Sequence, residues 1–134
     1  MMMIGAGSTM IPCLRYRDAA AAIDWLCAAF GLERQLVVPG EGGGVAHAQL
    51  TWGTGMVMIG SHPAPEGWAG PGDDASSLHV LTTDPDAVHD RARAAGATIV
   101  QSIADQDFGG RAFTCRDPEG YVWSFGSYDP WHVA

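Results

Sequence analysis

The sequence contains Asp117-Pro118-Glu119-Gly120, followed at 121–126 by Tyr-Val-Trp-Ser-Phe-Gly. Asp-Pro-Glu-Gly has tight-turn chemistry, because proline presets φ, aspartate bonds its own backbone ahead, and glycine accepts any φ. The residues after it are aromatic and β-branched, as is typical of a strand. This segment therefore predicts a hairpin that joins a strand ending near Arg116 to a long last strand.

A weaker copy of this pattern lies 65 residues earlier, where Gly55 precedes Met-Val-Met-Ile at 56–59. Two further glycines, Gly96 and Gly109, fall on Gly31 and Gly44 with the same offset. Helix ends and hairpin turns thus coincide, which indicates an internal repeat.

Each copy reads as strand, helix and three strands. In the first we expect strands at 11–17, 32–38, 45–52 and 56–60, and a helix capped by Asp18 and ended by Gly31. In the second we expect strands at 78–82, 97–103, 111–116 and 121–127, and a helix from Asp84-Pro85 to Ala95.

The predicted class is α+β: two βαβββ modules whose curved mixed sheets enclose a cleft. The modules are assigned to residues 9–61 and 77–128 within one structural domain. The Pro/Gly-rich linker between them, at 62–76, is of a kind that often forms a lid, and a tail follows at 129–134.

Composition excludes several classes of protein. The chain has 134 residues, of which 47% are hydrophobic and 16% charged, as expected of a well-cored globule. No apolar run is long enough for a membrane span, and the first residues lack signal-peptide features, so we expect a cytoplasmic protein without membrane contact. Three widely spaced cysteines favour reduced thiols. A net charge of −8 argues against nucleic acid and favours a cationic ligand, although solubility is the commoner reason for acidity.

Four segments carry a resemblance to a known family: Tyr16-Arg17-Asp18, Phe30-Gly31-Leu32-Glu33, Ala94-Ala95-Gly96-Ala97 and residues 117–126. Together they resemble the vicinal oxygen chelate superfamily, and most closely its uncharacterised glyoxalase/bleomycin-resistance-type proteins. The resemblance implies the paired-module fold over nearly the whole chain. It implies little about activity, because this fold hosts many chemistries.

The resemblance also implies where a metal would be held. Metal-using members place one His, Glu or Gln on each of four strands, and the matching positions here are Ile11, Ile59, Ser77 and Ser124. Divalent metals prefer imidazole, carboxylate or thiolate ligands, so we expect no metal and no cofactor. The minority alternative is a divalent metal at a displaced site, built from His47, His79 and Cys13 with Gln49 beside them.

Polar residues on alternate strand positions predict a ligand-binding cleft. The predicted lining is His47, Gln49, His79, Cys13, Ser77, Ser124, Arg111 and Thr114. Arg111 is open to two roles, clamping an anionic ligand or pairing with a carboxylate. The candidate general bases are His79 and His47. The three other histidines (His62, His89 and His132) are predicted to face solvent, and Trp123 and Phe125 to belong to the core. The aromatic tail with Tyr128 and Trp131 is predicted to pack on the other module or on a second subunit.

The sequence therefore predicts a metal-free protein that binds a small organic molecule, sequesters a cationic or aromatic compound, and forms a homodimer. The alternative is an enzyme, a glyoxalase-like lyase or isomerase that uses a displaced metal or a histidine base. A role in protein contacts alone leaves the polar face unexplained.

Overall fold

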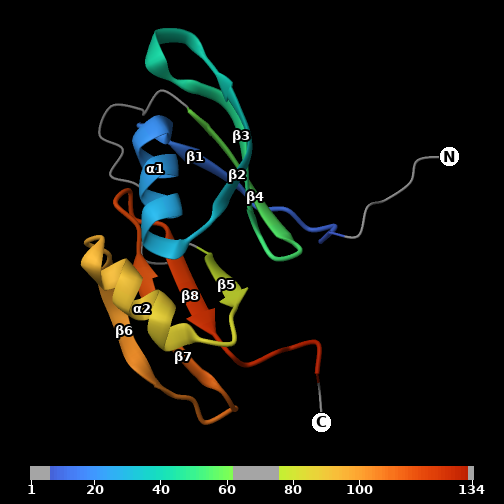
Figure 1. The fold of residues 1–134 in the computed structure, drawn as a ribbon, viewed down its shortest axis with the longest axis vertical. Coiled ribbons are helices and arrows are strands. Elements are labelled where there is room, and N and C mark those ends of the chain that lie inside the picture. The colour runs from blue at the N-terminus through green and yellow to red at the C-terminus, as the bar shows by residue number, and fades with distance from the viewer. Residues whose placement is uncertain (1–6, 62–75, 133–134) are drawn as a thin grey trace, which may run out of the picture. The chain divides into compact units, whose positions relative to one another are not determined.

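The computed structural model describes residues 7–61 and 76–132. Over these residues it contains two α-helices, eight strands and a short 3-10 turn, η1 (Glu41–Gly43), in the predicted order (Figure 1). The elements are β1 (Cys13–Tyr16), α1 (Ala19–Phe30), β2 (Glu33–Pro39), β3 (Val45–Trp52), β4 (Gly55–Ser61), β5 (Ser77–Leu81), α2 (Pro85–Ala94), β6 (Thr98–Asp105), β7 (Arg111–Arg116) and β8 (Val122–Gly126). Two four-stranded mixed sheets result, which confirms the predicted fold class.

The chain divides into two compact units. Of the described residues, unit 1 contains 7–27 and 31–61, and unit 2 contains 28–30 and 76–132. The last turn of α1 thus belongs to unit 2. There the Phe30 ring lies 5.1 Å from Trp123 and 4.7 Å from Phe125, centroid to centroid.

Unit 1 is built on sheet A, with strand order β1-β4-β3-β2, in which only the β1–β4 pair is parallel. One face of sheet A is buried and carries Leu14, Leu50 and Ile59, each at most 7% exposed. Helix α1 begins where Asp18 accepts a hydrogen bond from the Ala21 backbone, and it ends at Gly31, whose φ of 81° favours glycine. From β2, Arg34 forms an ion pair with Asp24 on α1.

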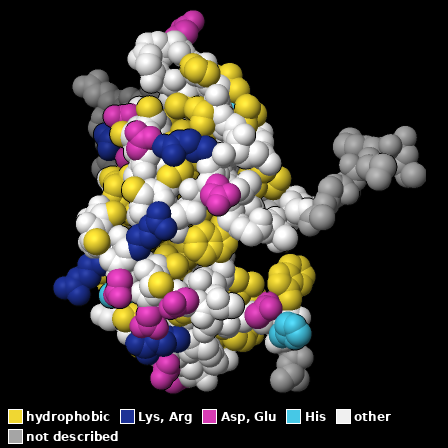
Figure 2. Space-filling view, in the orientation of Figure 1, with side chains coloured by type: hydrophobic (Ala, Val, Ile, Leu, Met, Phe, Trp, Pro, Cys, Tyr) yellow, Lys and Arg dark blue, Asp and Glu magenta, His cyan; other side chains and the backbone are white. Residues whose placement is uncertain are grey.

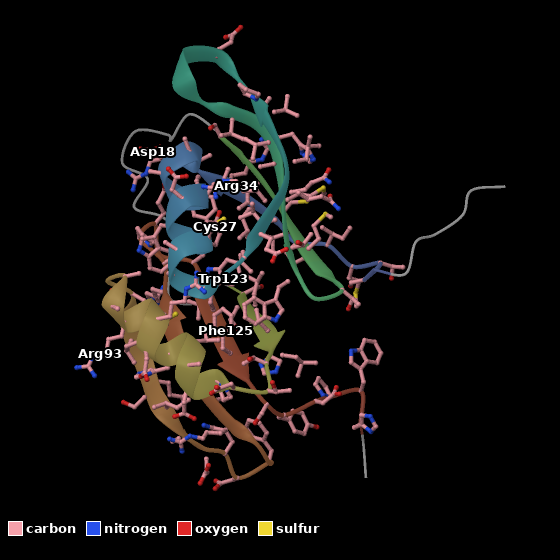
Figure 3. All side chains as sticks on the ribbon, viewed as in Figure 1. Asp18, Cys27, Arg34, Arg93, Trp123 and Phe125 are labelled. Atoms are coloured by element: carbon pink, nitrogen blue, oxygen red, sulfur yellow. The ribbon has the colours of Figure 1, made fainter. Side chains whose placement is uncertain are left out.

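Unit 2 repeats this topology in sheet B, with strand order β5-β8-β7-β6. Its buried face carries Phe113, Cys115, Trp123 and Phe125, each at most 1% exposed, and α2 contacts β6, β7 and β8. Figure 3 shows Trp123 and Phe125 extending from β8. The prediction that both aromatic residues are core residues is confirmed. Asp84 caps α2 by accepting from the Ala87 backbone, and Pro85 is the first helical residue, as predicted.

The Asp-Pro-Glu-Gly turn is held by the buried Asp117 carboxylate, which is 4% exposed. Its Oδ1 accepts from the backbone N–H groups of Glu119 and Tyr121, both at 3.1 Å. Its Oδ2 accepts from the indole Nε1 of Trp123, also at 3.1 Å. One side chain therefore closes the turn and fixes the largest core residue of the next strand, which confirms the predicted hairpin.

The offset between the two copies is not constant along the chain. Helix ends and hairpin glycines match at 65 residues, but the β1–β4 pair Leu14–Ile59 matches the β5–β8 pair Leu78–Trp123 at 64. Since side chains alternate between faces, this one-residue difference reverses the face. Ile59 is 2% exposed and lies on the buried face, so the predicted equivalence of Ile59 with Ser124 is wrong.

Two predictions fall outside the described residues. The linker at 62–76, with its lid role, lies there except for its last residue, and His62 lies there too. Across the described part of the chain, no helix has the length and apolar character needed to cross a membrane.

Candidate functional site

Each sheet has a second face, opposite its buried one, which we call its open face. Ladder pairing places Gln49 beside Met58 on that face of sheet A, and Thr114 beside Ser124 on that face of sheet B. Acidic and basic side chains mix on the surface shown in Figure 2, with no broad basic region on that face.

On the open face of sheet A, three polar side chains form a chain of hydrogen bonds. His47 Nε2 lies 2.8 Å from Gln49 Oε1, and Gln49 Nε2 donates to Gln35 Oε1 at 2.5 Å. Since Gln49 Oε1 is an acceptor, His47 Nε2 must carry the proton and donate. The structure thus brings together the predicted His47 and Gln49 and adds Gln35, which the sequence analysis missed.

Gln35 reaches Gln49 because β2 is irregular at that point. The β2–β3 register passes from Arg34–Leu50 to Leu36–Gln49, so Gln35 is an extra residue in β2. Such a bulge changes the direction of a side chain, and bulges are frequent beside binding sites. Alternation along β2 gives no sign of it, so the sequence could not identify Gln35.

On the open face of sheet B, a polar row crosses all four strands. His79 pairs with Ser124, Ser124 with Thr114, and Thr114 with Gln101. The hydroxyl oxygens of Thr114 and Ser124 lie 2.8 Å apart, and Thr114 donates to Gln101 Oε1 at 3.5 Å. Either hydroxyl can donate in the Thr114–Ser124 bond. Gln101 is a second residue that the sequence analysis missed.

The imidazole of His79 is held at one nitrogen. Its Nε2 lies 3.5 Å from the carbonyl oxygen of Tyr128, which only accepts, so Nε2 is the donor. A Cβ added at Gly126 would lie 3.3 Å from His79 Cε1 and 3.0 Å from the Ala112 methyl group. Gly126 therefore leaves the space in which the His79 ring lies, and Nδ1 remains an acceptor.

The remaining predicted cleft residues divide between two faces. Cys13 and Ser77 are exposed and alternate with the buried Leu14 and the half-buried Leu78, which places them on the open faces of sheets A and B. Arg111 shares strand parity with Phe113 and lies on the opposite side of sheet B from Thr114. The structure therefore does not group Arg111 with the other residues.

Arg111 takes the second of its two predicted roles. Its Nε and Nη2 donate to both oxygens of Asp86, at 2.9 and 3.1 Å, and Nη1 contacts Asp105 at 3.4 Å. These bonds lower the pKa of Asp86, chiefly through the Arg111 hydrogen bond. The pKa of Arg111 is raised, first by the hydrogen bond with Asp86.

The prediction for His89 is wrong, and the packing of the aromatic tail on a second subunit stays a prediction. His89 was expected in solvent, but its side chain is 12% exposed and its ring meets Phe113 edge-on at 5.1 Å. The apolar pattern of α2 gave the wrong exposure for His89, because His89 follows the buried Val88 and lies at the edge of the apolar face of the helix. Tyr128 packs on Phe108 of its own unit, with centroids 5.3 Å apart. Trp131 is 86% exposed, and His132 is exposed as predicted.

The residues present do not fit the metal site that the fold family implies. Of the expected ligand positions, Ile59 is apolar and buried. The residue that lies 64 positions before Ser124 is Gly60, which has no side chain. Ile11, Ser77 and Ser124 are poor ligands for a divalent metal. In residues 7–61 and 76–132, no three His, Cys, Asp or Glu side chains are grouped to hold a metal ion.

None of the three thiols forms a disulfide, and they differ in exposure. Cys13 is exposed, whereas Cys115 is buried in the core of sheet B. Burial, together with the nearby charge of Asp117, raises the pKa of the Cys115 thiol to about 12. Cys115 is therefore a core residue and not a nucleophile.

Two βαβββ units, each with a polar open face, place this chain in the class of proteins built from two such modules. Comparison with known proteins identifies the family. Residues 7–125 match the model of the glyoxalase/bleomycin resistance protein/dioxygenase superfamily. This chain belongs to that superfamily. An uncharacterized protein of Mycobacterium bovis is 36% identical over 132 residues, covering 93% of this chain and 86% of its own length.

Solved structures agree with this assignment. TioX from Micromonospora sp. ML1 is 36% identical and has a TM-score of 0.72, covering 90% of this chain and 98% of its own. Lactoylglutathione lyase from Agrobacterium tumefaciens is 19% identical, with a TM-score of 0.61 and coverage of 89% and 92%. The second likeness concerns the fold alone.

Proposed function

We propose that this chain binds a small organic molecule, without a metal ion, through the polar open faces of its sheets. The observation that carries the proposal is that both open faces hold polar side chains already ordered by one another. The pairs His47–Gln49 and Thr114–Ser124 are each 2.8 Å apart. Binding sites commonly combine apolar surface with a few fixed polar groups.

The class of ligand follows from charge and surface. The chain carries −8 net charge, which attracts cations, and Met56 and Met58 alternate along the open face of sheet A. We therefore propose that the ligand is a cationic or aromatic compound that the protein sequesters. The homodimer and the cytoplasmic location stay predictions, and light scattering measures the first.

The test is a thermal-shift screen of neutral and cationic aromatic fragments, run with and without EDTA. Ligands that bind only the folded state raise the melting temperature in proportion to the logarithm of their concentration. We expect hits whose shifts are unchanged by EDTA and are reduced in His47→Ala or His79→Ala. A complete absence of hits, or shifts that EDTA abolishes, would contradict the proposal.

A second candidate function is enzymatic, and the orientation of His79 favours it. With Nε2 donating to the Tyr128 carbonyl, Nδ1 presents a lone pair that can accept a proton from a bound substrate. This is the chemistry of a glyoxalase-like isomerase or lyase with a histidine base. The assay offers the hemithioacetal of methylglyoxal and glutathione to the chelator-treated protein. Turnover that disappears in His79→Ala would support catalysis, and binding without turnover would support sequestration.

A further inference from the structure

The three-residue chain on the open face of sheet A has a fixed direction. Gln49 uses Oε1 to accept from His47 and Nε2 to donate to Gln35. Turning the Gln49 amide alone would set its NH2 group against the His47 Nε2 proton and its oxygen against Gln35 Oε1, and both bonds would be lost. The tautomer of His47 and the orientations of the two amides are therefore coupled, and in this structure the bonds run from His47 through Gln49 to Gln35.

This direction decides what the two ends offer to a ligand. His47 gives its Nε2 proton to Gln49, so its Nδ1 is an acceptor. Gln35 receives a proton at Oε1, so its Nε2 keeps two hydrogens to donate. The face presents an acceptor at one end and a neutral donor at the other, with no charged group in the chain of bonds.

Apolar side chains border this polar line. In the ladder, Gln49 pairs with Leu36 on one side and Met58 on the other, and His47 pairs with Val38. Leu36 and Val38 are 44% and 40% exposed, and Met58 is half-buried. A ligand that covers the polar line therefore also removes apolar surface from water, which stabilises the complex.

We propose that the open face of sheet A recognises neutral amides: molecules with an apolar body, an N–H that donates to His47 Nδ1, and a carbonyl that accepts from Gln35 Nε2. This inference rests on the proposed function and selects, for the open face of sheet A, an uncharged ligand with an apolar or aromatic body over a cationic one. Gln49 acts as a positioning residue, because it sets which atoms of its two neighbours face the ligand. The bulge at Gln35 is the backbone feature that places the donor beside Gln49.

The test uses two probes of nearly the same shape, N-methyl-3-phenylpropanamide and methyl 3-phenylpropanoate, which contain one amide and no amide, respectively. The ester replaces one N–H by oxygen and so removes one donor. Dissociation constants are measured by NMR titration of labelled protein. One hydrogen bond contributes about 1 kcal/mol, so we expect the methylamide to bind wild type about fivefold more tightly than the ester.

Substitutions in the protein test whether the tighter binding of the methylamide depends on the hydrogen bonds between His47, Gln49 and Gln35. We expect it to disappear in His47→Ala and in Gln49→Leu, and to persist in Thr98→Val, a control substitution at an exposed residue of β6 in unit 2. Equal binding of the two probes by wild type, binding of neither, or a preference that survives in His47→Ala would overturn the inference. In each case hits from the fragment screen would leave the proposed binding function standing, and only an empty screen would remove both.

Discussion

The substitution Asp117→Asn tests the physical account of the turn that joins β7 to β8. Asparagine keeps one oxygen, which can still accept from the Glu119 and Tyr121 backbones as Oδ1 does now. Its amide group, however, would face the Trp123 Nε1 proton in place of Oδ2. Trp123 is 1% exposed, so water cannot replace the lost acceptor.

The expected cost follows from these contacts. A buried donor without an acceptor costs about 1–3 kcal/mol, so Asp117→Asn should lower the free energy of unfolding by that amount. Asp117→Ala leaves three donors without this acceptor and should cost roughly 2–5 kcal/mol. The matched control is Asp107→Asn, an exposed residue of the β6–β7 turn, for which we expect a change within about 0.5 kcal/mol.

The assay is urea unfolding followed by far-ultraviolet circular dichroism, because tryptophan fluorescence would itself respond to changes at Trp123. A double-mutant cycle with Trp123→Phe isolates the indole bond. Phenylalanine has no N–H, so Asp117→Asn should cost about 1 kcal/mol less in that background. Equal costs in the two backgrounds would refute the reasoning.

Three further predictions concern side chains and backbone elsewhere. Because the folded-state pKa of Cys115 is raised to about 12, the unfolded chain loses this proton first as pH rises above about 9. The melting temperature should therefore fall between pH 9 and 12 more steeply in wild type than in Cys115→Ala. The same pH dependence of the melting temperature in both proteins would contradict this. The pKa of Asp86 is lowered by Arg111, so its contribution to stability is present above the unfolded pKa of about 3.9 and is lost as pH falls. Carboxyl NMR titration should show a return toward the ordinary value in Arg111→Gln, and an unchanged midpoint would exclude the ion pair as cause. Gly110→Ala should destabilise more than Gly43→Ala in urea unfolding. Both have positive φ, 71° and 79°, but only at Gly110 would the Cβ approach a backbone nitrogen, to 2.6 Å, and equal costs would count against that contact.

Local chemistry made most of the fold predictable. Asp18 and Asp84 cap helices, Gly31 ends one, and the limits of β3 and β7 coincide with the predicted ones, because each depends on residues adjacent in sequence. The positions that failed depend on pairing between strands. The 65-residue offset placed Ile59 on the wrong face, since one residue of register reverses every side chain.

The candidate site was predictable to the same extent. Alternation in β3 placed His47 and Gln49 on one face, and the turn before β8 gave the phase of Ser124. The cross-strand partners were not predictable, because Gln35 faces Gln49 only through a bulge, and Gln101 pairs with Thr114 only after a register shift in β6. Arg111 was ambiguous because its partner Asp86 lies 25 residues away on a helix.

The most direct test of the central claim is a titration of chelator-treated, isotope-labelled protein with the strongest hit of the fragment screen, followed at the imidazole resonances. His47 and His79 belong to the open faces. His89 packs on Phe113 and His132 lies in the exposed tail, so His89 and His132 are internal controls. We expect saturable shifts of the His47 or His79 resonances, with those of His89 and His132 unmoved and with no metal added. Shifts confined to the two controls, or binding that returns only after Zn²⁺ or Ni²⁺ is added, would contradict it.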